Sequence, residues 1–265
     1  MAPTTTPQNF TQASAEASLL WQRHFEKLDA SSFPVLPSHL KRPHAAAEAE
    51  YSIDFPAAAA VQQDQDSITS VCRAALAVLL ARYTHASEVL FGIAVEGPSG
   101  PTQNVLPTRV FCDPHQSVSS LLRAVSFHDA AVRGLKHAGL NLDSVRHAGD
   151  FGAAACEFQT VLAVTSSSNI PTTNTATNNN TFKSPSLDRA LFITCRLAKG
   201  SASILARYDE SVLDARQAGR FLRQLGLLIK LFQTATDVDH LPLGELDILT
   251  AEDRTEIQGW NAAPL

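Results

Sequence analysis

The chain has 265 residues, of which 45% are apolar and 18% are charged, and its formal net charge is -5 at pH 7. This length can bury a core, and the composition is that of a globular domain, which excludes intrinsic disorder and a membrane-spanning protein. The acidic balance excludes a basic face that follows a phosphate backbone, so we expect neither nucleic acid nor a membrane as a partner.

The N-terminal residues carry no basic stretch followed by an apolar one, so they do not resemble a secretion signal and we expect a cytoplasmic protein. The four cysteines lie about forty residues apart, without metal-ligand spacing. We expect each to be a small buried side chain: Cys72, Cys112, Cys156 and Cys195. This predicts no metal and no cofactor in the chain.

The first elements come from apolar spacing. Residues 11–29 carry Trp21, Phe25 and Leu28 at helical spacing, which predicts an amphipathic entry helix. The proline-rich segment 31–43 favours an extended linker. Alternation over residues 51–55 then predicts a half-buried strand.

The strongest helix signal of the N-terminal half covers residues 67–83, and a continuous apolar run at 88–95 predicts a buried strand directly after it. A glycine and proline turn separates that run from a second strand at 104–111. Ser117 caps a further predicted helix, and a short helical stretch is expected at 140–145.

In the C-terminal half, strands are predicted at 158–164, 191–198 and 202–208, and a Ser/Thr/Asn-rich mobile loop at 166–186. Asp214 and Gln217 have capping-box spacing at the start of a long amphipathic helix. Strands alternate with helices, which predicts an α/β fold with helices packed on a mixed β-sheet.

Several segments, in this order, resemble condensation domains of nonribosomal peptide synthetases, of the chloramphenicol-acetyltransferase-like superfamily. They are the Phe33-Pro-Val-Leu-Pro37 segment, Ala75–Val95, Asn104–Val110 and Phe158–Val164. Residues 246–253 and 257–261 resemble the passage from a condensation domain into an adenylation domain. The resemblance implies a single chloramphenicol-acetyltransferase-like lobe.

The family's catalytic HHxxxDG motif is absent, since no two histidines are adjacent in the chain. The turn from Gly97 to Gln103 is also shorter than in the family. We therefore expect the C-terminal lobe of a truncated condensation domain from the start of a fungal synthetase. The expected divisions are an entry helix and linker at 1–45, the lobe at 46–243, and a linker toward an adenylation domain at 244–265.

Three residues are weak catalytic candidates: His147, Asp150 and His128. His147-Ala-Gly-Asp150 imitates the motif, but its acid is one residue too close. His128 and its neighbour Asp129 point to different sides of a predicted helix, which favours a surface pair. We therefore expect no catalysis by this chain.

The predicted function is a structural or docking platform for the adenylation domain of the same synthetase. The predicted contact residues are apolar side chains of the last segment: Leu243, Leu246, Ile248, Leu249, Ile257 and Trp260. Two alternatives stay open, an acyltransferase active only as an assembly and a module that recognises a peptidyl carrier domain. The resemblance implies phosphopantetheine and ATP with magnesium for the whole synthetase.

Overall fold

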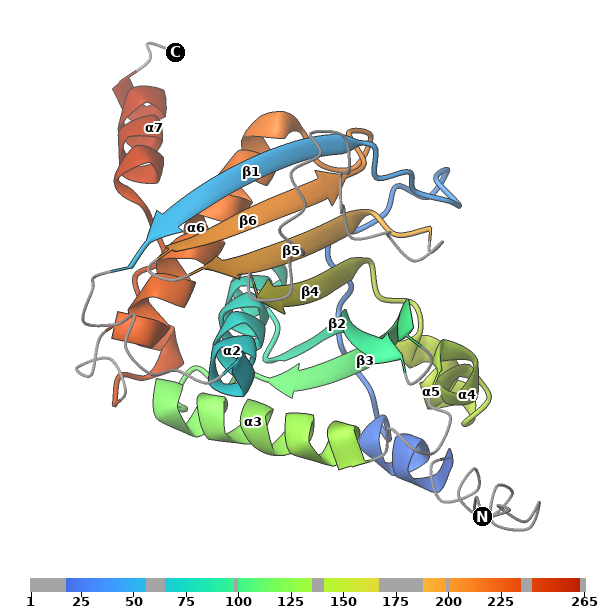
Figure 1. Ribbon diagram of the computed structural model, residues 1–265. Helices are drawn as coiled ribbons and strands as arrows, with labels where there is room; N and C mark the ends of the chain where they lie inside the picture. Colours follow the sequence, from blue (N-terminus) through green and yellow to red (C-terminus); the bar gives the residue numbers. More distant parts are fainter. Residues whose placement is uncertain are drawn as a thin grey trace, which may run out of the picture.

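The computed structural model describes residues 18–55, 65–97, 100–134, 141–166, 188–198, 201–234 and 240–262. They form one six-stranded sheet in the order β1-β6-β5-β4-β2-β3, with helices packed against it (Figure 1). The pairs β2–β4 and β4–β5 are parallel, and the other neighbours are antiparallel. The predicted α/β class with a mixed sheet is therefore confirmed.

All six predicted strands are present, some longer than predicted: β1 (Ala47–Asp54), β2 (Glu88–Gly97), β3 (Gly100–Phe111), β4 (Thr160–Ser166), β5 (Leu191–Ala198) and β6 (Ser201–Tyr208). Along β6, half-buried and buried residues alternate, as a strand with one covered face requires. The predicted mobile loop, apart from its first residue, lies outside the described residues.

Residues 18–24 are helical, and the remaining helices are α2 (Gln65–Thr84), α3 (Val118–Gly134), α4 (Leu142–Arg146), α5 (Asp150–Ala155), α6 (Ala215–Thr234), the short 3-10 helix η4 (Leu243–Glu245) and α7 (Ala251–Ala262). Helix α2 packs against α3 and α6 and covers β2 and β4, while α6 covers β1 and β6. Within the described ranges, no helix is long and apolar enough to cross a membrane.

The predicted capping box at the start of α6 is confirmed. The backbone N–H of Gln217 donates to Asp214 Oδ1 at 2.8 Å, and that of Asp214 donates to Gln217 Oε1 at 2.9 Å. These bonds satisfy donors that a helix start leaves without intrahelical partners. All four cysteines are buried free thiols, as predicted.

Residues 30–37, called here the entry segment, lie along the sheet and α6, with Phe33 and Leu36 half-buried and Ser31 and Val35 exposed. Ser31 forms a parallel bridge with Val89 at the start of β2, and Thr160 Oγ1 of β4 donates to the carbonyl of Phe33 at 2.6 Å. The ring of Phe33 is stacked on Phe221 of α6, with 5.3 Å between the ring centroids. The predicted extended linker is therefore attached to the core through Phe33.

Arg109 of β3 holds the N-terminal helix against the sheet. Its Nη1 donates to the carbonyls of His24 and Glu26, both at 3.0 Å, and its Nε lies 2.8 Å from Glu88 Oε1. The side chains of Arg109 and Glu88 are only 10% and 11% exposed. Because each charge is neutralised by the other, both can be buried without an unpaired charge.

Candidate functional site

The structure places the three catalytic candidates separately. His147 follows α4, where its ring Nδ1 lies 2.7 Å from the carbonyl oxygen of Asp143, and Asp150 opens α5 with an exposed side chain. Between these two described residues there is no hydrogen bond or ion pair. His128 belongs to α3, and its side chain lies outside the described part. Of the two candidates whose side chains are described, His147 and Asp150, the geometry makes no catalytic pair.

The six predicted contact residues divide into two groups. Leu243 and Leu246 are 3% and 6% exposed and belong to the core, and Ile248 is packed against it. The other three are exposed: Leu249, Ile257 and Trp260. The first group anchors the last segment to the lobe, and the second remains accessible at the margin where α7 lies in Figure 1.

Backbone contacts fix the start of this last segment. Arg82 Nη2, at the end of α2, donates to the carbonyls of Leu243 and Gly244 at 2.7 and 2.8 Å. The N–H of Leu243 donates to Gln116 O, and that of Gly244 to Pro114 O, both at 2.8 Å. The segment therefore leaves the lobe in a defined direction.

A buried carboxylate holds the start of α7 against α6. Asp253 is 1% exposed, and its Oδ2 accepts from Gln224 Nε2 at 2.9 Å and from the N–H of Thr250 at 3.2 Å. Its Oδ1 accepts from Arg223 Nη2 at 3.0 Å. The N–H of Asp253 in turn donates to Thr250 Oγ1 at 3.2 Å, so the pair also caps α7.

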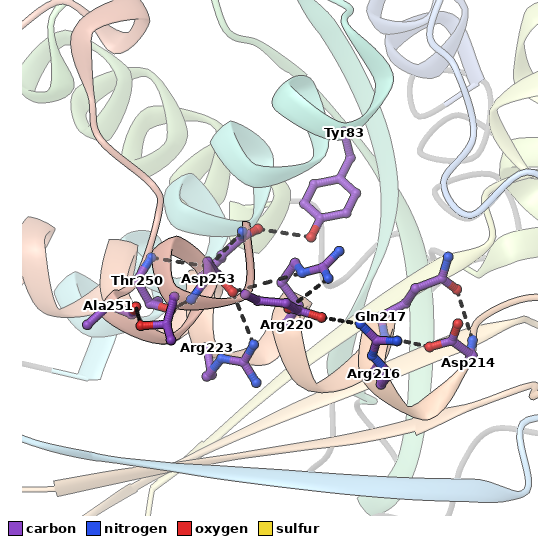
Figure 2. A network of polar contacts seen from close by, with 12 residues as sticks. Tyr83, Asp214, Arg216, Gln217, Arg220, Arg223, Thr250, Ala251 and Asp253 are labelled. Carbon is purple, nitrogen blue, oxygen red and sulfur yellow. Dashed lines mark hydrogen bonds and ion pairs between the residues drawn. The ribbon is translucent and has the colours of Figure 1, made fainter. Parts of the chain in front are cut away.

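The hydroxyl of Tyr83, on α2, donates to Gln224 Oε1 at 2.9 Å. Tyr83, Arg223, Gln224, Thr250 and Asp253 are called here the Asp253 network. Figure 2 shows the tyrosine entering it from α2 and Thr250 from the segment before α7. Three elements that are distant in the sequence are therefore joined through Gln224 and Asp253.

One helical turn further along α7, Glu256 extends this contact. It is paired with Arg216 and, at 2.9 Å, with Arg220 Nη2. The guanidinium of Arg220 lies 5.2 Å from the ring centroid of Trp260, which remains 52% exposed. The arginine therefore contacts both the acidic and the aromatic side chain of α7.

The charges of the network are fixed by its contacts. Burial raises the pKa of Asp253, but the hydrogen bonds from Gln224, Thr250 and Arg223 outweigh it, so the pKa lies below its usual range. Burial raises the pKa of Tyr83 to about 12. At neutral pH, Asp253 is therefore an anionic acceptor and Tyr83 a neutral donor.

The sequence analysis did not identify the Asp253 network. Two local signals point to it: the Thr250-x-x-Asp253 capping spacing, and arginines at Arg216, Arg220 and Arg223, which share one side of α6. Neither signal names the tyrosine or the glutamine, whose partners lie on other elements. Within the described ranges, no group of three or more His, Cys, Asp or Glu side chains could hold a metal ion.

No protein-family model matches the chain. It is 46% identical over 263 residues to PF 1022-synthetase of Rosellinia sp., and this alignment covers 94% of the chain and 8% of the synthetase. It is 42% identical over 277 residues to the beauvericin nonribosomal cyclodepsipeptide synthetase of Beauveria bassiana, covering 98% of this chain and 8% of the relative. The chain therefore spans about 8% of the length of these curated relatives.

Solved structures share the fold at low identity. A mutant starter condensation domain of rhizomide synthetase, in complex with C8-CoA and Leu-SNAC, gives a TM-score of 0.67 at 16% identity, over 90% of this chain and 56% of that one. The X-domain in a complex with OxyB from teicoplanin biosynthesis gives 0.62 at 17% identity, over 90% and 56%. In each case the chain corresponds to slightly more than half of the solved protein.

Proposed function

The chain is homologous to fungal nonribosomal cyclodepsipeptide synthetases and has the fold of a condensation-domain fragment, and from this premise we propose that it is a non-catalytic platform that docks an adenylation domain. The resemblance predicted from the sequence motifs is confirmed. The observation that carries the proposal is the fixed attachment of α7, whose buried Asp253 binds α6 while Trp260 stays exposed.

Anchored and accessible groups alternate along the last segment, which supports a docking role. Buried Leu246 and Asp253 hold it to the lobe, and the exposed Leu249, Ile257 and Trp260 are large apolar side chains in contact with water. Aromatic residues at such positions supply much of the binding energy of protein interfaces. We therefore propose these three side chains as the contact with the adenylation domain.

The polar arrangement favours docking over chemistry in this chain. A general base must reach the proton that it abstracts, within hydrogen-bond distance or through one water. No hydrogen bond or ion pair joins His147 to Asp150, and the HHxxxDG motif does not occur in the sequence. The X-domain complex with OxyB supports the use of this fold for a protein contact.

We further propose the division into an entry helix and linker at 1–45, a lobe at 46–243 and a linker at 244–265. In this arrangement the synthetase works in the cytoplasm and contains carrier domains. It uses phosphopantetheine and ATP with magnesium in domains other than this one. Because Leu246 is part of the core and Asp253 is bound to α6, this linker stays attached to the lobe as far as the first turn of α7.

The test is to produce the adenylation domain of the same synthetase alone and fused to residues 1–265, and to compare soluble yield, thermal midpoint and the rate of amino-acid adenylation. We expect the fusion to raise the yield and the midpoint. Trp260→Ala should lose much of that gain, because truncating an interface aromatic commonly costs about 2 kcal/mol or more.

Phe127→Ala is the matched control, since Phe127 is also an exposed aromatic residue, at 79%, but lies on α3. This variant should retain the full gain in soluble yield and thermal midpoint. Equal yield, midpoint and adenylation rate with and without residues 1–265 would exclude the docking function. An equal loss in both alanine variants would exclude the assigned surface.

One observation favours a second candidate function, an acyltransferase completed by another chain: the related fold of the starter condensation domain binds C8-CoA and Leu-SNAC. Its test is peptide-bond formation by the assembled protein with thioester substrates. Loss of product in His147→Ala, with wild-type assembly, would support this function. A monomer that forms no product would count against it.

A further inference from the structure

We propose that the entry segment and helix α7 are energetically coupled through Tyr83, so that displacing Phe33 loosens α7 from α6. The inference rests on the proposed docking function, because it gives that surface a form of regulation. It concerns a positioning residue, since Tyr83 acts on α7 only through Gln224 and Asp253. A contact made with the entry segment would then change the presentation of Trp260 on α7.

The contact between the entry segment and Tyr83 consists of three aromatic rings. Phe33 lies 5.2 Å from Tyr83 in an edge-to-face arrangement and 5.3 Å from Phe221 in a stacked one, measured between ring centroids. Tyr83 and Phe221 are themselves 5.3 Å apart. Each ring restricts the other two, so a shift of Phe33 removes one side of the site that positions the Tyr83 ring.

The contact between Tyr83 and α7 depends on the two ends of the Gln224 side-chain amide. Gln224 Oε1 accepts from the Tyr83 hydroxyl at 2.9 Å, and Nε2 donates to Asp253 Oδ2 at 2.9 Å. Gln224 is 4% exposed, so water cannot readily replace either partner. Since an ionised carboxylate only accepts, Asp253 turns the N–H end of the amide toward itself, and the oxygen end accepts from the Tyr83 hydroxyl.

Two properties of the tyrosine suit it to this role. Because burial raises the pKa of Tyr83 to about 12, the hydroxyl stays protonated and remains a donor at neutral pH. Hydrogen bonds in series also polarise one another in a medium of low dielectric constant, so removing the first weakens the next. The chain Tyr83–Gln224–Asp253 therefore transmits the position of the ring to α7.

The test is hydrogen exchange of the α7 amides, measured by mass spectrometry on the full 265-residue chain. Tyr83→Phe keeps the ring and removes the hydroxyl, and we expect roughly three- to tenfold faster α7 exchange, the effect of one lost hydrogen bond. Phe33→Leu, which keeps an apolar side chain, should act in the same direction. Exchange in β5 should not change, because the effect is local.

A double-mutant cycle tests the route itself. In an Asp253→Ala background, adding Tyr83→Phe should have less effect than in the wild type, because Gln224 then has no acceptor on α7 and the two residues act in series. Tyr51→Phe is the matched control: its ring lies against another part of α6, near Gly226, and it should leave α7 exchange unchanged.

Unchanged α7 exchange in both Tyr83→Phe and Phe33→Leu would overturn the proposal. So would a full effect of Tyr83→Phe in the Asp253→Ala background. An acceleration of exchange that is as large in β5 as in α7 would also overturn it. Because these measurements need no adenylation domain, their failure is distinguishable from failure of the docking function.

Discussion

Replacing Asp253 by asparagine tests the central contact, because the change keeps the shape of the side chain and removes its charge. The amide introduced by this change could still accept hydrogen bonds from Gln224 and Thr250, so the principal loss is the charged pair with Arg223. The side chains of Arg223 and Asp253 are 25% and 2% exposed. A hydrogen bond to a charged group contributes about 1.5–3 kcal/mol, so we expect a loss of about 2 kcal/mol.

At roughly 1.36 kcal/mol for each factor of ten, this loss corresponds to about a 30-fold larger fraction of molecules with α7 detached. The chain contains only two tryptophans, so Trp21→Phe leaves Trp260 on α7 as the single tryptophan reporter. A urea titration of that variant, with and without Asp253→Asn, measures the difference. Asp247→Asn is the control, because its pair with Arg254 is exposed and should contribute at most about 1 kcal/mol.

The effect should depend on pH with a defined sign. Since the pKa of Asp253 is lower in the folded chain than its ordinary value of about 3.9, its stabilisation is complete above that value and is lost as the pH falls through the folded pKa. The difference in free energy of unfolding between wild type and Asp253→Asn should be largest at pH 7 and should shrink progressively below about pH 4. A gap under about 0.5 kcal/mol at pH 7, or one unchanged by acid, would refute the reasoning.

Two further changes test the packing of the lobe by urea denaturation. Gly226→Ala should destabilise it by about 1–3 kcal/mol, although alanine favours helices, because the added Cβ would lie 2.6 Å from Cε1 of Tyr51. Gly219→Ala on the same helix meets no atom closer than 3.7 Å and should be neutral or stabilising. Arg109→Met should cost about 3–5 kcal/mol by leaving Glu88 buried without its partner, and a loss below about 1 kcal/mol would contradict the assigned role.

The helices and strands could be predicted from the sequence because their signals are local. The capping box of Asp214 and Gln217 lies within four residues, and the alternation along β6 depends only on the period of a strand. The motifs at residues 246–253 and 257–261 and the apolar runs similarly predicted the condensation-domain fold. These signals do not depend on which distant segment packs against an element.

The candidate site could be predicted only in part, because burial at its residues depends on distant partners. Leu246 and Trp260 are both large and apolar, yet one is 6% exposed and the other 52%. Gln224 is 29 residues from Asp253 and 141 from Tyr83, so no periodicity links the three. The sequence therefore predicted a contact for the last segment, but it did not predict the carboxylate that binds this segment to α6.

The chemistry of this attachment favours orientation over simple adhesion. Burial of apolar surface is nearly indifferent to direction, so Leu243 and Leu246 alone would hold the segment without setting the angle of α7. Hydrogen bonds to Asp253 are directional, and they arrive from Arg223, Gln224 and the backbone of Thr250. A carboxylate that is 1% exposed cannot rotate away from these donors without a cost of desolvation. The lobe therefore presents α7 at one angle, which is what a platform for a following domain requires.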